Sequence, residues 1–104
     1  MPLYSVSLLF KSEHAKKPDT DPLWEERIVL VKANNEEDAK REGLRIGKQA
    51  DHEYAVIGDT VRWTFMQNER VCQIEDENLK NGTELFSRFL RDSEVKSILT
   101  PFED

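Results

Sequence analysis

Three patterns in the sequence predict an α+β domain, in which one long helix packs on one face of a mostly antiparallel sheet. Apolar and polar residues alternate over several short stretches, which is typical of half-buried strands. One longer stretch places apolar and small residues at helical spacing. Turn-forming residues separate the strand candidates closely enough for hairpins. The predicted order is β-β-α-β-β-β-β-α, in a single domain over residues 1–104 with its core at 3–91.

The first two strand candidates flank a polar loop. Residues 3–11 alternate, with Tyr4, Val6, Leu8 and Phe10 on one face and Ser5 and Ser7 on the other, wet face. Residues 12–22 carry two prolines and predict an exposed, mobile loop that joins antiparallel strands. The second strand begins at Trp24, and its run Ile28–Val31 is apolar on both faces, which predicts a strand covered on both sides.

The helix follows directly, with Asn34 or Asn35 as its N-cap, and extends to about Ala50. Its inward positions are mostly small, and they are Ala39, Gly43, Ile46, Gly47 and Ala50. A glycine in a helix interior costs roughly 1 kcal/mol relative to alanine. We therefore expect the helix to approach the sheet closely. The alternative is that the helix ends near Gly47, with this glycine as its C-cap.

Three short strand candidates come after the helix, at 54–57, 60–67 and 70–76. Turns are predicted at Gly58-Asp59, with glycine in the first central position, and at Asn68-Glu69. The side chains expected to face inward from the last two strands are Val61, Trp63, Phe65, Cys72 and Ile74.

The end of the chain has two interpretations. Asn81-Gly82 is the strongest turn signal, because both residues accept the positive φ of a type I′ turn. Residues 83–91 could return across that turn as a strand, or could form a helix, since their apolar residues also fit helical spacing. The turn chemistry favours the strand. A short helix is predicted over 93–99, with Ser93 as its cap.

Charge and cysteine content limit the classes of function. The formal net charge of −6 argues against general nucleic-acid binding, which needs a basic surface, and against binding to an anionic membrane. A single cysteine, Cys72, precludes an internal disulfide and fits a reducing compartment. The sequence has neither a signal peptide nor the roughly 20 consecutive apolar residues of a membrane helix. We expect a cytoplasmic protein.

No catalytic, cofactor-binding or metal-binding motif is present in the sequence. His14 and His52 lack metal-ligand spacing, so we expect both to be solvated. Cys72 is interpreted as a small buried apolar residue, because no base can be placed beside it. The aromatic residues Trp24 and Trp63 are interpreted as core, since an acidic protein is a poor platform for stacking nucleic-acid bases.

Acidic residues supply the candidates for partner binding. Glu25 and Glu26 are adjacent on a strand, so they point to opposite faces and cannot work as a paired acid and base. One of them is expected to pair across the sheet with Arg62 or Arg88. The cluster Glu75-Asp76-Glu77 is either a solvated edge that discourages aggregation or a docking point for a basic partner. The candidate partner-binding residues are Glu25, Glu26, Glu75, Asp76 and Glu77.

Several short motifs in a fixed order resemble a known family. They are Tyr4-Ser5-Val6, Trp24-Glu25-Glu26-Arg27 leading into Leu30, Val31 and Ala33, Glu36-Glu37 before Ala39, Trp63 with Phe65, and Gly82-Thr83-Glu84-Leu85-Phe86-Ser87-Arg88. Together they resemble domain of unknown function 4288, found in small bacterial proteins. The resemblance implies a bacterial source and a stand-alone cytoplasmic protein, and it transfers no catalytic residue.

These observations leave three hypotheses for function. The first is a non-enzymatic module that binds another protein, for example an immunity-type protein that blocks a basic toxin through its acidic surface. The second is a small-ligand binder or enzyme with a pocket between helix and sheet, lined by Arg27, Tyr54, Arg62 and a glutamate. The third is self-association through an open sheet edge.

Overall fold

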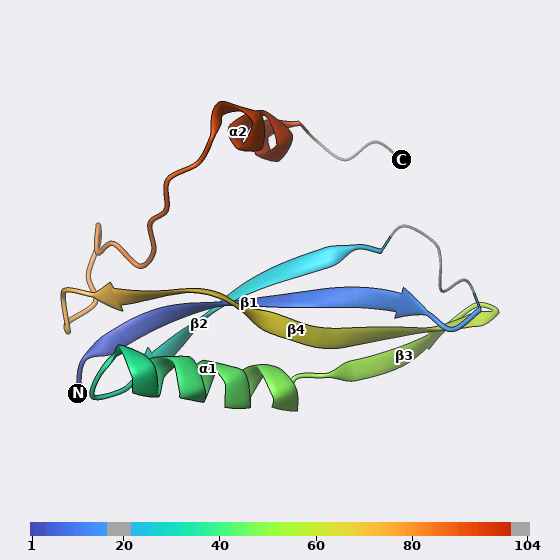
Figure 1. The fold of residues 1–104 in the computed structure, drawn as a ribbon, viewed down its shortest axis with the longest axis horizontal. Helices are drawn as coiled ribbons and strands as arrows, with labels where there is room; N and C mark the ends of the chain where they lie inside the picture. Colours follow the sequence, from blue (N-terminus) through green and yellow to red (C-terminus); the bar gives the residue numbers. More distant parts are fainter. Residues whose placement is uncertain (17–21, 101–104) are drawn as a thin grey trace.

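A computed structural model describes residues 1–16 and 22–100 of the chain. Figure 1 shows a curled sheet of four strands in the order β2-β1-β4-β3, with neighbouring strands antiparallel. The elements are β1 (Leu3–His14), β2 (Trp24–Lys32), α1 (Glu36–Gln49), β3 (His52–Val56), β4 (Asp59–Ile74) and α2 (Asp92–Leu99). The predicted α+β class and antiparallel sheet are confirmed.

The predicted number of strands after α1 is wrong. The candidates at 60–67 and 70–76 form one continuous strand, β4, and Asn68-Glu69 is not a turn. Bulges in β4 explain the difference: its register against β1 shifts between Ser7 and Leu8 and again between Leu9 and Phe10. Each bulge interrupts the alternation of β4, so one strand resembles two in the sequence. The order over the described residues is β-β-α-β-β-α.

The hairpin between β3 and β4 and the end of β1 also differ from the prediction. Val56 pairs with Asp59, so the two turn residues are Ile57 and Gly58, and glycine occupies the second position with a φ of 78°. Strand β1 continues to His14, so the first residues of the predicted loop 12–22 belong to the sheet. Residues 17–21 of that predicted loop lie outside the described residues.

One face of the sheet, here called the inner face, packs on α1 and holds the core. The register places Tyr4, Val6, Leu8 and Phe10 on this face, and all four are buried, as predicted. Trp63 and Phe65 of β4 pack against the same cluster. Phe10 and Phe65 meet with their ring centroids 5.6 Å apart.

The opposite face, here called the outer face, differs from the prediction in two ways. Ser5 and Ser7 are buried rather than wet, because a segment near the end of the chain covers them. Ile28 and Leu30 are about half exposed, at 48% and 50%, so β2 is not covered on both sides. Trp24 is 49% exposed and is not a core residue. Strand β2 is an edge strand, and its outer apolar side chains are not fully covered.

Continuity of β4 places Cys72 and Ile74 on the outer face, opposite Phe65, instead of turning them toward α1. The two bulges cancel, so Val71 returns to the face of Phe65. Cys72 pairs with Ser5 and Ile74 with Leu3, and these β1 residues both belong to the outer face. Ile74 is buried and Cys72 is half-buried. The chain therefore buries apolar groups on both sides of the sheet.

Close packing of α1 on the sheet is confirmed, and the helix continues past Gly47 to Gln49. Asn35 is the N-cap and accepts a hydrogen bond from Asp38 N at 2.9 Å. A Cβ atom added at Gly43 would lie 2.7 Å from Val6 Cγ1, and one at Gly47 would overlap the Phe65 ring. The glycines allow the helix backbone to approach nearer than any larger residue permits.

The C-terminal part corrects the remaining predictions. Gly82 has a φ of 90°, and Thr83 N donates to Lys80 O, so a turn exists at Asn81-Gly82. It is not the predicted type I′ turn, because Asn81 lacks the positive φ that this type requires. Residues 83–91 nevertheless form neither strand nor helix. A hairpin needs a strand entering the turn, but the strand has already ended at Ile74. Helix α2 is capped by Arg91 rather than by Ser93.

Replacing Gly43 or Gly47 by leucine should destabilise the fold, because the new side chain meets Val6 or the Phe65 ring. Overpacking of this kind costs about 1–3 kcal/mol, in spite of the gain in helix propensity. Urea unfolding of each variant measures the loss. Lys48→Leu, at an exposed position of the same helix, is the control and should stay close to the parent. An unchanged midpoint for Gly47→Leu would contradict tight packing.

Candidate partner-binding surface

The segment after the Gly82 turn is fixed to the outer face by contacts with three strands. We call residues 83–99 the C-terminal arm. Ser5 Oγ of β1 donates a hydrogen bond to the Leu85 carbonyl, and Cys72 Sγ of β4 lies 3.7 Å from the Ser87 carbonyl. Arg88 Nη1 lies 3.7 Å from Glu26 Oε2 of β2. The arm therefore crosses the sheet from β4 toward the β2 edge.

Glu26 is a structural residue at this crossing. Its carboxylate accepts a hydrogen bond from Ser7 Oγ at 2.6 Å and pairs with Arg88. Ser7 is fully buried, so the pair helps to seal the outer face. The predicted pairing of a glutamate with Arg88 is found, but Arg88 lies in the C-terminal arm, so it is not the cross-strand pair that was predicted. Arg62 lies 3.9 Å from Asp51 instead.

Glu25 points to the inner face, as predicted from the alternation of the strand. It accepts a hydrogen bond from Arg27 Nε at 2.6 Å. The Arg27 guanidinium lies over the Phe10 ring, 4.4 Å from its centroid. Glu25 and Glu26 are therefore on opposite sides of the sheet, and the structure does not bring them into one acidic surface with the 75–77 cluster.

The acidic cluster 75–77 lies just past the end of β4. Asp76 accepts a hydrogen bond from Asn78 N at 3.1 Å and lies 3.4 Å from Lys80 Nζ. Glu75 and Glu77 are exposed. Glu77 borders an open depression at this end of the sheet, which we call the end depression; it is lined by Met1, Leu3, Leu30, Lys32, Glu77, Asn78 and Leu79.

The end depression combines apolar walls with a polar rim, in which Glu77 and Lys32 carry opposite charges. Leu30, Leu79 and Met1 are 50%, 53% and 71% exposed. Contiguous exposed apolar side chains within a polar rim mark interaction sites on soluble proteins. Sequence reasoning identified Glu77 but missed Leu79. The available signal was one leucine in an otherwise polar stretch beside the acidic cluster.

The predicted pocket between helix and sheet is not formed by its predicted residues. Arg27 and Tyr54 belong to the inner face and Arg62 to the outer face. The Tyr54 hydroxyl instead accepts a hydrogen bond from Trp63 Nε1 at 3.3 Å. Where α1 meets β1 and β4, the glycine contacts leave no space for a ligand.

An open groove does run along the flank of α1 beside β4. It is lined by Glu36, Lys40, Leu44, Gln67, Asn68, Glu69, Arg70 and Val71. Asn68 Nδ2 donates to the Lys40 carbonyl at 3.0 Å, which links the strand to the helix. The Asn68 side-chain oxygen is buried without a hydrogen-bond partner. This groove is the part of the helix–sheet boundary where polar groups converge.

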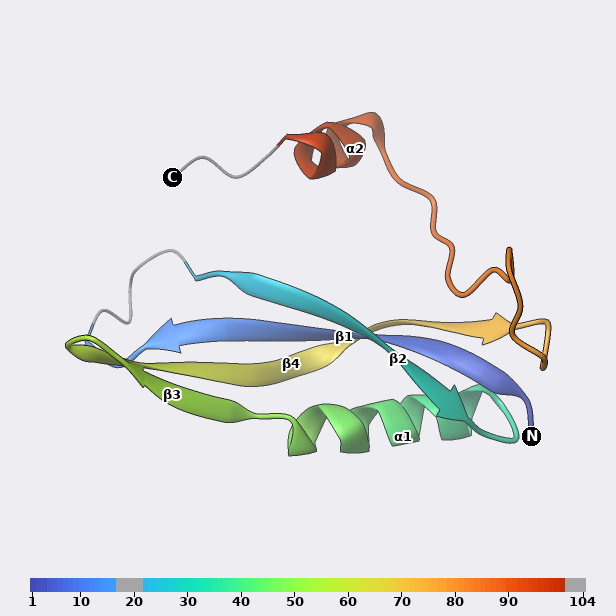
Figure 2. The same cartoon turned by 180° about the vertical axis from the view of Figure 1, so that it is seen from behind.

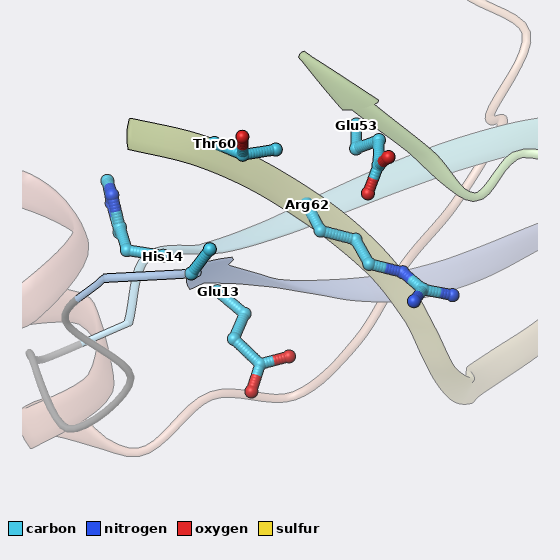
Figure 3. A pocket seen from close by; sticks show the side chains of 6 residues that line it. Glu13, His14, Glu53, Thr60 and Arg62 are labelled. Atoms are coloured by element: carbon cyan, nitrogen blue, oxygen red, sulfur yellow. The ribbon is translucent and has the colours of Figure 1, made fainter. Parts of the chain in front are cut away.

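A second depression lies at the far end of the sheet (Figure 3), where Glu13, Arg62 and Glu53 stand opposite one another on β1, β4 and β3. Its volume of about 180 Å³ is below the roughly 300–1,000 Å³ of typical ligand sites. It is therefore better suited to charge pairing across strands than to holding an organic ligand.

Beside this depression, Asp59 ties the end of β1 to the start of β4. Its carboxylate accepts hydrogen bonds from Thr60 N at 2.8 Å and Lys16 N at 3.0 Å, and lies 3.2 Å from His14 Nδ1. Burial acts to raise the pKa of Asp59, but the hydrogen bonds from Thr60, Lys16 and His14 outweigh it and lower the pKa. His14 is therefore engaged by a carboxylate rather than merely solvated.

In the parts of the chain that the structure describes, no group of three or more histidine, cysteine, aspartate or glutamate residues is arranged to hold a metal ion. His14 ends β1 and His52 begins β3. Within residues 1–16 and 22–100, no helix is long and apolar enough to cross a membrane.

Comparison with known proteins identifies one relationship. A family model described as Domain of unknown function (DUF4288) matches residues 3–87, which spans the sheet, α1 and the first part of the C-terminal arm. No curated protein and no solved structure matches the chain.

The Asp59 carboxylate predicts a loss of stability in acid. Folding lowers the pKa of Asp59, so its carboxylate stabilises the folded state. This stabilisation is complete at a pH above the ordinary aspartate pKa of about 3.9, and it is lost as the pH falls through the lower pKa of the folded state. Asp59→Asn should be less stable than the parent near neutral pH, and the difference should shrink in strong acid. Urea unfolding across this pH range measures both. His14→Gln removes one of the three donors, so its stability near neutral pH should lie between those of the parent and Asp59→Asn. Identical pH dependence of unfolding in the parent and Asp59→Asn would disprove this assignment.

Proposed function

Because the chain belongs to the DUF4288 family, a domain of unknown function, we propose its function from geometry: it is a non-enzymatic module that binds another protein. The observation that supports this proposal is the end depression. There, exposed apolar side chains meet an acidic cluster at the edge of a rigid sheet. The bacterial source and cytoplasmic location implied by the resemblance and by the single cysteine are part of the proposal.

The depression favours a partner with an apolar side chain flanked by lysine or arginine. Leu79 and Leu30 offer the apolar contact, and Glu77 supplies negative charge in the lining, two residues after the exposed Glu75. Buried apolar anchors supply most of the affinity of an interface, and surrounding charges supply specificity and association rate. The net charge of −6 adds long-range attraction for a basic protein. An immunity-type protein that blocks a basic toxin is the specific form of this proposal.

A second candidate function rests on the groove along α1. The buried, unpartnered oxygen of Asn68 and the charged groups of Lys40, Glu69 and Arg70 would suit a small polar ligand. The groove is open to solvent rather than enclosed, which is unfavourable for holding a small ligand. Asn68→Asp would change a ligand's binding there and leave partner capture unaffected.

Partner binding predicts salt-sensitive capture that depends on Leu79. A tagged full-length chain should retain a basic protein from bacterial lysate at about 0.1 M salt and retain less at about 1 M, since screening lengths fall from roughly 10 Å to 3 Å. Leu79→Asp should weaken binding at least about tenfold, equivalent to 1.4 kcal/mol. Glu77→Lys should mainly reduce the salt dependence and association rate.

Ile57→Asp is the matched control, because Ile57 is also a fully exposed apolar residue but lies in the β3–β4 hairpin. It should capture the partner as the parent does. If the tagged chain retains no protein above background at low salt, the proposal is wrong. Equal loss in Leu79→Asp and Ile57→Asp would show that the end depression is not the binding site.

A further inference from the structure

Helix α2 has an apolar side without a partner in its own chain. Among the described residues, no Cα atom of α2 lies within 8 Å of one in a strand or in α1, and no residue of α2 is buried. Val95, Ile98 and Leu99 lie on one side of the helix, and Ile98 and Leu99 are 59% and 76% exposed. Phe89, just before the helix, is fully exposed. An eight-residue helix is not stable alone in water, so its apolar side needs a surface to pack on.

The outer face offers a matching apolar surface along β2. On this side of the strand, Trp24 is followed by Glu26, which pairs with Arg88, and then by Ile28 and Leu30. The three apolar side chains are each about half exposed. We call these three residues the β2 strip. Leu30, at the end of the strip, also lines the end depression, so the two surfaces adjoin.

Charges around the two surfaces are complementary. Lys11 Nζ lies over the Trp24 ring, 5.7 Å from its centroid, and Lys32 follows Leu30 at the other end of the strip. The apolar side of α2 is bordered by Asp92 and Glu94 at helical spacing. Their pairs with Lys96 and Arg91 are highly exposed and therefore weak, so the carboxylates are available for a new contact.

The course of the arm directs α2 away from its own strip. Arg88 is held at Glu26, and only residues 89–91 separate it from the helix. These are Phe89, Leu90 and Arg91, which include no glycine, proline, asparagine or aspartate for a reversal of direction. Arg91 itself is extended, with φ −76° and ψ 158°. Figures 1 and 2 agree that α2 stands off the sheet on the side of β2, on the opposite side from α1.

We propose that the occupant of the β2 strip is helix α2 of a second copy of this chain, and that two copies exchange their α2 helices reciprocally. The same patch then contacts itself around a two-fold axis, which closes the assembly at a dimer. Each copy contributes both the helix and the strip, so every contact occurs twice. Aromatic side chains such as Trp24 and Phe89 bury about 150–250 Å² each, which brings the interface toward the roughly 1,200–2,000 Å² of stable complexes. The proposal is independent of the protein-binding function assigned to the end depression.

Light scattering coupled to size-exclusion chromatography tests the assembly with the full-length chain. The expected mass is twice the chain mass of 12.2 kDa. Ile98→Asp in the helix and Ile28→Asp in the strip should each give folded monomers with a cooperative melting transition, because neither side chain is buried. Their helical signal in circular dichroism should fall by no more than the contribution of α2, which loses its packing surface. Ile57→Asp is again the matched control and should remain dimeric. A monomeric parent, or a dimer that survives Ile98→Asp, overturns the proposal.

Cysteine pairing then separates exchange between copies from docking within one copy. In a Cys72→Ser background, which retains a hydroxyl donor toward Ser87, a tagged Ile28→Cys chain is mixed with an untagged Ile98→Cys chain under mild oxidation. Exchange predicts a disulfide-linked heterodimer of tagged and untagged chains. Docking within one copy predicts that a chain carrying both cysteines closes an internal disulfide and that the mixture gives no linked pair. This result overturns the proposal. Neither result depends on a protein captured at the end depression.

Discussion

The contact between two helical glycines and the sheet determines most of this structure. Gly43 faces Val6 and Gly47 faces the Phe65 ring, at distances where a methyl group would collide. Because the helix lies so close, the inner core is one layer of side chains, contributed by β1 and its neighbours β2 and β4, that packs directly on α1. There is consequently no room for a ligand where Gly43 and Gly47 meet the sheet.

The continuity of β4 has a second consequence, on the opposite face. Because its two bulges cancel, Cys72 and Ile74 lie on the outer side, where Ser5 and Ser7 of β1 are also buried. A sheet of four strands with one helix has two faces to cover, and α1 covers only one. The C-terminal arm covers part of the other through backbone carbonyls and one ion pair, and the β2 strip is left half exposed.

The exposed apolar surfaces of this chain result from the incomplete covering of the outer face. The end depression, the β2 strip and the apolar side of α2 all lie on or beside the outer face, which has no helix packed on it. A partner at the end depression and a second copy at the strip would together complete the second layer that packed sheets normally possess. Acidic residues near these surfaces have different roles. Glu26 holds the C-terminal arm, whereas Glu77 is exposed at the rim of the end depression.

Local sequence patterns determined the first half of the fold. The alternation of β1, the Asn35 cap and the small face of α1 were predicted because each depends on neighbours within a few residues. The opposite faces of Glu25 and Glu26 followed from strand geometry alone. Tertiary structure decided the rest, because long-range packing overrides local preference there. The two strands predicted after β3 form one bulged strand, β4. Residues 83–91 form no strand, although the turn chemistry favours one, and they lie against the buried serines of β1. The candidate site was likewise only partly predictable. The acidic cluster 75–77 is a local feature of the sequence. The apolar walls beside it come from β1, β2 and the chain beyond β4, which only the folded sheet brings together.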